Sequence, residues 1–211
     1  MKINIHKITA GAFQENGYIV HSEESSDCFI VDPGDNPELY IEKIKKNGLK
    51  PIGILNTHGH IDHVHAVQPL KEEYSIPFYL HDKDKMLLGD HYQNACLMYG
   101  MIPGNIPEVD TSINDETELQ IGEYNIKILH TPGHTLGGLC YQINGDIFTG
   151  DTLFKGSIGR TDLPGGDYNT LMDSLKKLIT EVPGNIRVHS GHGYSTTIEN
   201  EVLSNPFLVN L

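Results

Sequence analysis

The stretch His58-Gly59-His60-Ile61-Asp62-His63 places three imidazoles and one carboxylate within six residues. Imidazole nitrogen and carboxylate oxygen are ligands that zinc, iron and manganese accept. Two histidines separated by one residue of extended chain can point at one ion, and Asp62 with His63 can hold a second. The alternative interpretation is a polar loop in which Asp62 caps the helix that follows. The spacing favours a metal site.

Three further polar residues, His134, Asp151 and His192, follow apolar runs and each stand directly after a glycine. Glycine accepts positive φ and lets the backbone approach a ligand closely, so such turns can bring side chains together at one edge of a sheet. Taken singly, each has a simpler explanation as a cap or a solvated turn residue. Together with the first cluster they give five histidines and two aspartates, which suits two ions that share a bridging ligand.

The 211 residues can bury a core without disulfide bonds, and we expect one domain spanning residues 1–211. Cys28, Cys96 and Cys140 lie far apart and are odd in number, which predicts buried thiols in a reducing compartment. The N-terminus alternates apolar and polar residues like a strand and has no run suited to secretion. We therefore expect a cytoplasmic protein.

The net charge of −13 would repel a phosphate backbone, so we expect no nucleic-acid partner. No stretch approaches the roughly 20 apolar residues that a membrane span requires, so we expect a soluble protein with no membrane partner. The oligomeric state stays open at this stage.

Apolar and β-branched runs bounded by glycine, proline, asparagine and aspartate predict strands at Ile3–Ile8, Tyr18–Val20, Phe29–Val31, Ile52–Leu55, Phe78–Leu80, Ile126–Leu129, Leu139–Ile143, Ile147–Thr149 and Arg187–His189. Apolar residues at helical spacing predict helices at Pro37–Lys46, Val64–Tyr74 and Tyr168–Ile179. The stretch Tyr92–Tyr99 is interpreted as a surface helix, with a substrate-facing flap as the alternative. The chain is therefore expected to be of the mixed α/β class.

Four strings carry a resemblance: Thr57-His58-Gly59-His60-Ile61-Asp62-His63, Thr131-Pro132-Gly133-His134-Thr135, Gly150-Asp151-Thr152-Leu153-Phe154 and Gly191-His192-Gly193. They are similar to the successive motifs of the metallo-β-lactamase fold superfamily, in its glyoxalase II (hydroxyacylglutathione hydrolase) branch. The resemblance runs from about Tyr18 to the C-terminus and implies an αββα sandwich with a dinuclear metal site at the sandwich edge. Val31-Asp32-Pro33-Gly34 fits the early strand and turn of that fold.

The resemblance also implies a ligand set for two divalent metal ions, with zinc expected and iron or manganese as alternatives. His58, His60 and His134 would hold the first ion, whereas Asp62, His63 and His192 would hold the second, and Asp151 would bridge both.

The implied activity is hydrolysis of a thioester by a metal-bound hydroxide, with Asp62 and Asp151 as the catalytic residues. The expected substrate is a small-molecule thioester, with a glutathione thioester as one candidate. Two metals lower the pKa of a shared water, and a thiolate leaves without strong protonation because thiol pKa values lie near 8–9.

The chain departs from the long glyoxalase II enzymes in ways that bear on substrate binding. It ends at Leu211, so the C-terminal helical domain of those enzymes is not expected. Arg160 falls where they carry a lysine for a glutathione carboxylate, and we expect it to contact substrate, with an ion pair to Asp162 as the alternative. Asp162 replaces a tyrosine and Gly138 a histidine. The pattern is most similar to short bacterial glyoxalase II-like hydrolases.

The main alternative function is a persulfide dioxygenase with a single iron, because those relatives share the motifs and a string like Gly159-Arg160-Thr161-Asp162. A β-lactamase is disfavoured by the lack of a secretion signal. A non-catalytic metal-binding module is disfavoured because structural zinc sites are closed and rich in thiolates.

Two histidines near the motifs are not expected to be ligands: His65 lies on the following helix, and His130 is expected to orient the Thr131–His134 turn by hydrogen bonding. The other histidines outside the motifs, His6, His21, His81, His91 and His189, are interpreted as ordinary.

Overall fold

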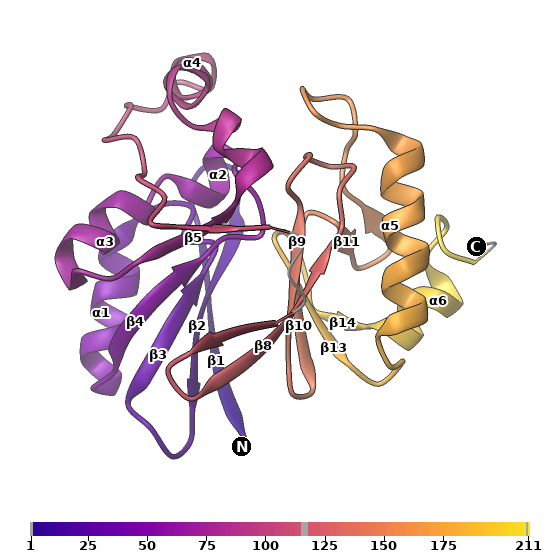
Figure 1. Ribbon diagram of the computed structural model, residues 1–211, viewed down its shortest axis with the longest axis horizontal. Helices are drawn as coiled ribbons and strands as arrows, with labels where there is room; N and C mark the ends of the chain where they lie inside the picture. Colours follow the sequence, from indigo (N-terminus) through magenta and orange to yellow (C-terminus); the bar gives the residue numbers. More distant parts are fainter. Residues whose placement is uncertain (1, 115–117, 210) are drawn as a thin grey trace. The chain divides into compact units, whose positions relative to one another are not determined.

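The computed structural model describes residues 2–114, 118–209 and 211. The chain divides into two compact units, residues 1–113 and 114–211, and each contains one six-stranded sheet (Figure 1). The single domain expected from the sequence stays a prediction.

The sheet of the first unit has the strand order β1-β2-β3-β4-β5-β6. Its strands are β1 (Ile3–Ala10), β2 (Glu15–Ser22), β3 (Asp27–Val31), β4 (Lys50–Leu55), β5 (Phe78–His81) and β6 (Thr111–Ile113). The first three strands pair antiparallel, and β3 to β6 pair parallel. The helices are α1 (Pro37–Asn47), α2 (Ile61–Val64), α3 (Val67–Tyr74), η1 (Asp82–Leu87) and α4 (Asp90–Met98).

The core of the first unit forms where α1 and α3 cover the sheet. Tyr40 and Ile44 of α1 and Leu70 of α3 are fully buried against strand residues such as Ile54 and Phe78. Burying each of these side chains stabilises the unit by roughly 1.5–3 kcal/mol. This packing fixes the parallel strands, and the loop with the predicted ligands His58, His60, Asp62 and His63 follows the end of one of them, β4.

The carboxyl ends of parallel strands meet at one edge of a sheet, and here that edge brings together the loops that follow β3 and β4. Val31 at the end of β3 pairs with Leu55 at the end of β4. The backbone N–H of Asp32 continues the pairing by donating to the Leu55 carbonyl at 3.1 Å. The loop after β3 therefore lies beside the loop that begins at Thr57.

The second unit has a sheet of order β14-β13-β10-β9-β8-β7, together with the hairpin β11-β12. Its strands are β7 (Glu118–Ile121), β8 (Tyr124–His130), β9 (Leu139–Ile143), β10 (Asp146–Gly150), β11 (Leu153–Phe154), β12 (Ser157–Ile158), β13 (Arg187–Ser190) and β14 (Thr196–Thr197). Its helices are α5 (Tyr168–Glu181) and α6 (Ile198–Ser204). Leu171, Leu175 and Leu178 of α5 are fully buried in the core of this unit.

Strands β10 and β13 are the parallel pair of this sheet, so the residues after them emerge at the same edge. Gly150 pairs with Ser190, and Gly191 N donates to the Gly150 carbonyl at 2.8 Å. Asp151 and His192 follow directly. The remaining candidate ligand, His134, lies in the turn between β8 and β9, where Gly133 has φ 126° and a Cβ would collide with the backbone of α5 at Leu171.

A buried carboxylate in α6 ties together three segments of the second unit. Glu201, which is 1% exposed, accepts hydrogen bonds from Gly156 N at 2.7 Å, Thr196 Oγ1 at 2.7 Å and Asn205 Nδ2 at 2.9 Å. These bonds hold the β11–β12 hairpin against the start and the end of α6.

Glu201→Ala should lower the free energy of unfolding by roughly 3 kcal/mol, because each buried donor left without its acceptor costs about 1–3 kcal/mol. The melting temperature should fall by on the order of 5–10 °C, which thermal unfolding followed by circular dichroism measures. Glu199→Ala is the matched control, since Glu199 is an exposed acid in the same first helical turn. Equal effects of the two substitutions would contradict the role given to Glu201.

All twelve predicted elements are present, with shifts at their ends, and the predicted mixed α/β class is confirmed. The predicted helix Val64–Tyr74 is wrong at its start, because α3 begins at Val67. The Ala66 N–H donates to the Pro33 carbonyl at 3.1 Å, which interrupts the helical hydrogen bonding after α2. The surface helix expected at Tyr92–Tyr99 corresponds to α4. Within the described residues, every helix falls short of the length and apolarity that a membrane crossing demands.

Candidate metal centre

In the first unit, the loop after β4 gathers three imidazoles. The ring centroids of His58 and His63 are 4.1 Å apart, and those of His58 and His60 are 4.9 Å apart. His58 and His63 are buried, at 2% and 0% exposed. The Asp62 Oδ2 atom lies 4.0 Å from His63 Nε2. The four predicted ligands of this unit are therefore brought together.

Asp32 orients two of these imidazoles. Its carboxylate accepts from Thr57 N at 2.7 Å and from Thr57 Oγ1 at 2.6 Å, and Thr57 Oγ1 lies 3.0 Å from His58 Nδ1. The same Oδ2 atom also lies at ion-pair distance from the second imidazole, 3.2 Å from His63 Nδ1. A carboxylate at Nδ1 fixes a histidine in the tautomer whose Nε2 carries the lone pair that a metal needs.

Asp32 adopts a left-handed conformation with φ 46°, which is uncommon for residues other than glycine. Such a conformation costs roughly 1–3 kcal/mol and persists where surrounding contacts enforce it. Here the enforcing contacts are the hydrogen bonds from Thr57 and the close approach of Gly34 to the backbone of Asp62, where a Cβ would collide.

A second buried carboxylate, Glu15 at the start of β2, lies beside the same histidine. Glu15 is 1% exposed, and its Oε1 lies 3.7 Å from His63 Nδ1. Two carboxylates around one imidazole make this pocket strongly negative. A bound cation would offset that charge.

A side chain of η1 fixes the middle of the loop that follows β4. Gly59 N donates to the carboxylate of Asp84 at 3.0 Å, and Asp84 is 1% exposed. This bond fixes the backbone between His58 and His60.

In the second unit, one carboxylate oxygen contacts two imidazoles at equal distances. Asp151 Oδ2 lies 3.6 Å from His134 Nε2 and 3.6 Å from His192 Nε2. Ligand atoms bound at 2.0–2.2 Å around a tetrahedral ion lie about 3.3–3.6 Å apart. The spacing therefore suits an oxygen that shares one ion with His134 and another with His192.

Carbonyl groups hold His134, which lies within the Thr131–Gly138 turn, and His130, which directly precedes it. His134 Nδ1 donates to the Arg160 carbonyl at 2.7 Å, which leaves the lone pair on the Nε2 atom that faces Asp151. His130 Nε2 lies 3.0 Å from the Leu136 carbonyl across the turn. The predicted hydrogen bond of His130 is present, and its partner is Leu136, just beyond the Thr131–His134 segment named in the prediction.

The side chain of Arg160 forms a two-pronged ion pair with Asp162, at 2.7 Å from Nε and 2.7 Å from Nη2. Both side chains are exposed. The hydrogen bonds from Arg160 lower the pKa of Asp162 to about 2. Of the two predicted roles of Arg160, substrate contact and an ion pair with Asp162, the structure contains the ion pair.

The structure also gives definite positions or contacts for Asp62, His65 and His189. The capping interpretation of Asp62 is wrong, because His60 occupies the N-cap position of α2 and no side chain caps it, while Asp62 lies in the first turn. His65 Nδ1 lies 2.7 Å from the Tyr92 hydroxyl. His189 makes a structural contact, since its Nε2 lies 2.7 Å from Asp146 Oδ1 and joins β13 to β10.

The cysteines are buried free thiols, as expected. Burial raises the pKa of Cys28 to about 12, so this thiol stays protonated at neutral pH. The histidines and aspartates are therefore the donors to consider.

The donor set fits divalent metal ions. It combines imidazole nitrogen with carboxylate oxygen, it gathers negative charge, and Asp32 and the Arg160 carbonyl set the ring tautomers that coordination needs.

Sequence reasoning missed three residues that support the ligands: Asp32, Glu15 and Asp84. Asp32 has a sequence signal only as part of the Val31-Asp32-Pro33-Gly34 motif. Its position directly after strand β3 could have suggested a contact with a neighbouring loop. Glu15 and Asp84 gave no local signal, because their roles depend on pairing between distant segments.

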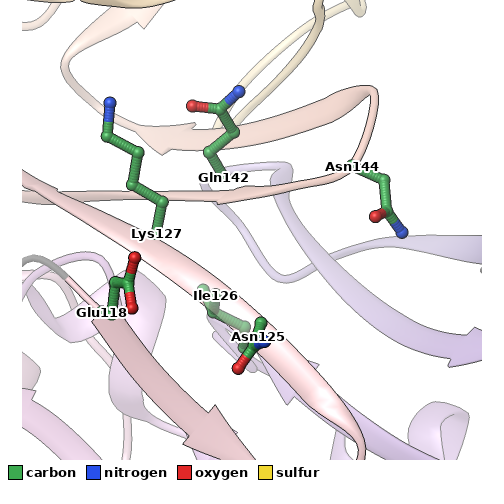
Figure 2. A pocket seen from close by; sticks show the side chains of 6 residues that line it. All are labelled: Glu118, Asn125, Ile126, Lys127, Gln142 and Asn144. Carbon is green, nitrogen blue, oxygen red and sulfur yellow. The ribbon is translucent and has the colours of Figure 1, made fainter.

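A hollow of about 230 Å³ on the sheet of the second unit contains none of the predicted site residues. Figure 2 shows its lining, which comes from β7, β8 and β9 and from the turn after β9. The lining is mainly polar, with Glu118, Lys127 and Gln142 among its residues. It is not part of the metal centre.

Comparison with known proteins places these features in a family. Residues 10–192 match the model of the metallo-beta-lactamase superfamily. The chain is 38% identical over 215 residues to hydroxyacylglutathione hydrolase GloC of Haemophilus influenzae, covering 98% of each chain. It is similar to the solved structure of BLEG-1 B3 metallo-beta-lactamase, with a TM-score of 0.90, 37% identity, and coverage of 97% of this chain and 99% of that one.

A third similar structure is TTHA1623 in a di-iron-bound form, with a TM-score of 0.87, 38% identity, and coverage of 96% of this chain and 100% of that one. These matches confirm the predicted fold class. The chain belongs to the metallo-beta-lactamase superfamily, as one of its metal-dependent hydrolases.

Proposed function

We propose that this chain is a thioesterase of the hydroxyacylglutathione hydrolase type, which uses water to cleave a small-molecule thioester. The observation that carries the proposal is the equal 3.6 Å distance from Asp151 Oδ2 to His134 Nε2 and His192 Nε2. The identity of 38% to GloC of Haemophilus influenzae supports the substrate class.

The proposal includes one pair of divalent ions held by all seven predicted ligands, with Asp151 shared between the ions: His58, His60, Asp62, His63, His134, Asp151 and His192. Two divalent ions, when bound, bring the pKa of a water molecule towards neutrality and polarise a carbonyl oxygen. Asp62 and Asp151 are the carboxylates at the reacting centre. No protein nucleophile is needed, because a thiolate leaves readily.

Zinc is the proposed metal. Iron is the alternative, because the similar protein TTHA1623 has been solved in a di-iron-bound form. Both metals accept imidazole and carboxylate, so the ligand chemistry suits either. Elemental analysis of the protein as isolated decides between them.

The composition supports a small molecule as substrate. A net charge of −13 opposes binding of nucleic acid. Arg160 is an exposed cation whose backbone carbonyl accepts from His134, which supports the proposal that its side chain exchanges Asp162 for a substrate carboxylate.

The direct test is hydrolysis of S-D-lactoylglutathione by the metal-loaded protein in ¹⁸O-labelled water. We expect label in the released carboxylate, with no acyl-enzyme detectable by mass spectrometry. Oxygen consumption with glutathione persulfide and one iron per chain would instead assign the chain to persulfide dioxygenase chemistry.

A second candidate is β-lactam hydrolysis, because BLEG-1, which is 37% identical over nearly the whole chain, is described as a B3 metallo-beta-lactamase. A β-lactam also has a carbonyl that water attacks. Turnover of a chromogenic cephalosporin, compared with thioester turnover by kcat/KM, ranks the two substrates.

Arg160→Ala should raise KM for S-D-lactoylglutathione and leave metal content unchanged. A charge-assisted hydrogen bond to a substrate carboxylate contributes about 1.5–3 kcal/mol, so the increase should be on the order of ten- to a hundredfold. The melting temperature should change little, because exposed ion pairs contribute little to stability.

Asp162→Asn is the control, since it removes the ion pair and keeps the cation. A lower melting temperature with unchanged KM for Arg160→Ala would show that Arg160 serves the loop alone.

A further inference from the structure

His6 of β1 and His21 of β2 bring two imidazole nitrogens together outside the candidate metal centre. Their Nε2 atoms are 3.2 Å apart. The ring centroids are 5.3 Å apart with the planes within 14° of parallel, so the rings meet through their nitrogen ends and not face to face. His6 pairs with Ile19 and His21 with Asn4, which makes the two histidines diagonal neighbours on one face of the strand pair.

The second nitrogen of His21 is already engaged. His21 Nδ1 lies 2.8 Å from the Ser22 carbonyl, which can only accept, so Nδ1 carries the hydrogen and Nε2 carries the lone pair. A carbonyl group at the opposite ring nitrogen is the usual arrangement for a histidine that binds metal.

The surroundings of His6 favour a neutral ring. Burial, His21 and the nearby Lys43 lower the pKa of His6, in that order. Neutral imidazole is the form that coordinates a metal.

The spacing of the nitrogens also suits coordination, because two nitrogens bound at 2.0–2.1 Å to a tetrahedral ion lie about 3.3 Å apart. We propose that His6 and His21 form a second metal site that binds a divalent transition-metal ion through both Nε2 atoms. Water completes the coordination. Among first-row ions, Cu²⁺ should bind most tightly and Zn²⁺ and Ni²⁺ less so, following the usual order for nitrogen ligands.

This pair lies at the opposite end of the sheet from the metal-binding loop. His21 pairs with Cys28 near the start of β3, and Cys28 pairs with Pro51 near the start of β4, whereas His58 follows the end of β4. The two sites therefore share no ligand. Two protein ligands and the nearby Lys43 charge make the His6–His21 site the weaker one, so it fills after the candidate centre.

The test uses full-length protein that already holds its own metal ions, with Cu²⁺ added as the probe. Paramagnetic Cu²⁺ broadens the amide signals of residues near it. Sub-stoichiometric Cu²⁺ should broaden Asn4 and Ile19 and spare the Thr57–His63 loop, and electron paramagnetic resonance should show two nitrogen ligands. Broadening confined to the Thr57–His63 loop would overturn the proposal.

His6→Gln and His21→Gln should each weaken Cu²⁺ binding roughly tenfold or more, because even a lost outer partner of a metal ligand costs ten- to a hundredfold. His91→Gln is the matched control, since His91 is an exposed histidine of the same unit. Unchanged affinity in either folded variant, judged from its amide spectrum, would show that the rings share only an N–H···N hydrogen bond. Because the readout is local and independent of turnover, it stands whether or not the proposed thioesterase activity is found.

Discussion

Asp151→Ala is expected to lose both metal ions, and with them nearly all hydrolytic activity. Its Oδ2 atom lies 3.6 Å from both His134 Nε2 and His192 Nε2. Replacement by alanine removes the shared ligand and leaves two histidines without the negative charge between them. Loss of a residue that only orients a metal ligand costs up to about a hundredfold in activity. Asp151 is proposed as a ligand itself, so we expect kcat/KM to fall by more than about a hundredfold.

Elemental analysis after dialysis measures the metal content of this variant. His192→Ala should chiefly lose one ion, so it separates a shared ligand from an unshared one. Asp173→Ala, which changes an exposed acid of α5, should retain both ions and full activity. Two tightly held ions in Asp151→Ala would show that Asp151 is not a bridge.

Asp32→Asn should weaken metal binding about ten- to a hundredfold, the usual cost of removing the partner that orients a metal-binding histidine. The carboxylate lies at ion-pair distance from His63 Nδ1 and reaches His58 through the Thr57 hydroxyl. Asparagine keeps the size of the side chain and accepts the left-handed conformation that Asp32 adopts, so the backbone should be preserved.

Competition with a chelator of known affinity measures this loss. Thr57→Val tests the indirect path alone, and we expect a smaller effect that falls on the ion bound by His58. Asp35→Asn makes the same change of charge in the same turn and should leave affinity unchanged. Equal affinities of Asp32→Asn and the unaltered chain would mean that the histidines are oriented by the fold alone.

The sequence predicted the elements of the two sheets because their strands are apolar runs with clear boundaries. It failed for β6, β7 and β14, which are two to four residues long and mostly polar. Such strands form because a neighbouring strand supplies hydrogen-bond partners. Local composition does not reveal which segments will lie next to each other.

The site divides in the same way. His134, Asp151 and His192 were found because residues directly after strands share a sheet edge, and the structure brings these three together. Whether all seven residues act as ligands stays a prediction. Glu15 and Asp84 were missed because each reaches His63 or Gly59 from a distant segment. The His6–His21 pair depends on the register of β1 against β2, which composition cannot give.

All seven predicted ligands lie in loops or turns between elements or in the single turn of α2, and buried cores hold the strands of each unit. In the second unit the exposed side chains of Lys155, Arg160 and Tyr194, which lie close in sequence to Asp151 or His192, contribute little to the core. Substitution of these side chains, in nature or in the laboratory, should therefore cost little folding stability. Such substitutions can change which substrate binds while the proposed metal ligands stay the same. A library restricted to these three positions should yield variants that differ in substrate preference and share one metal content.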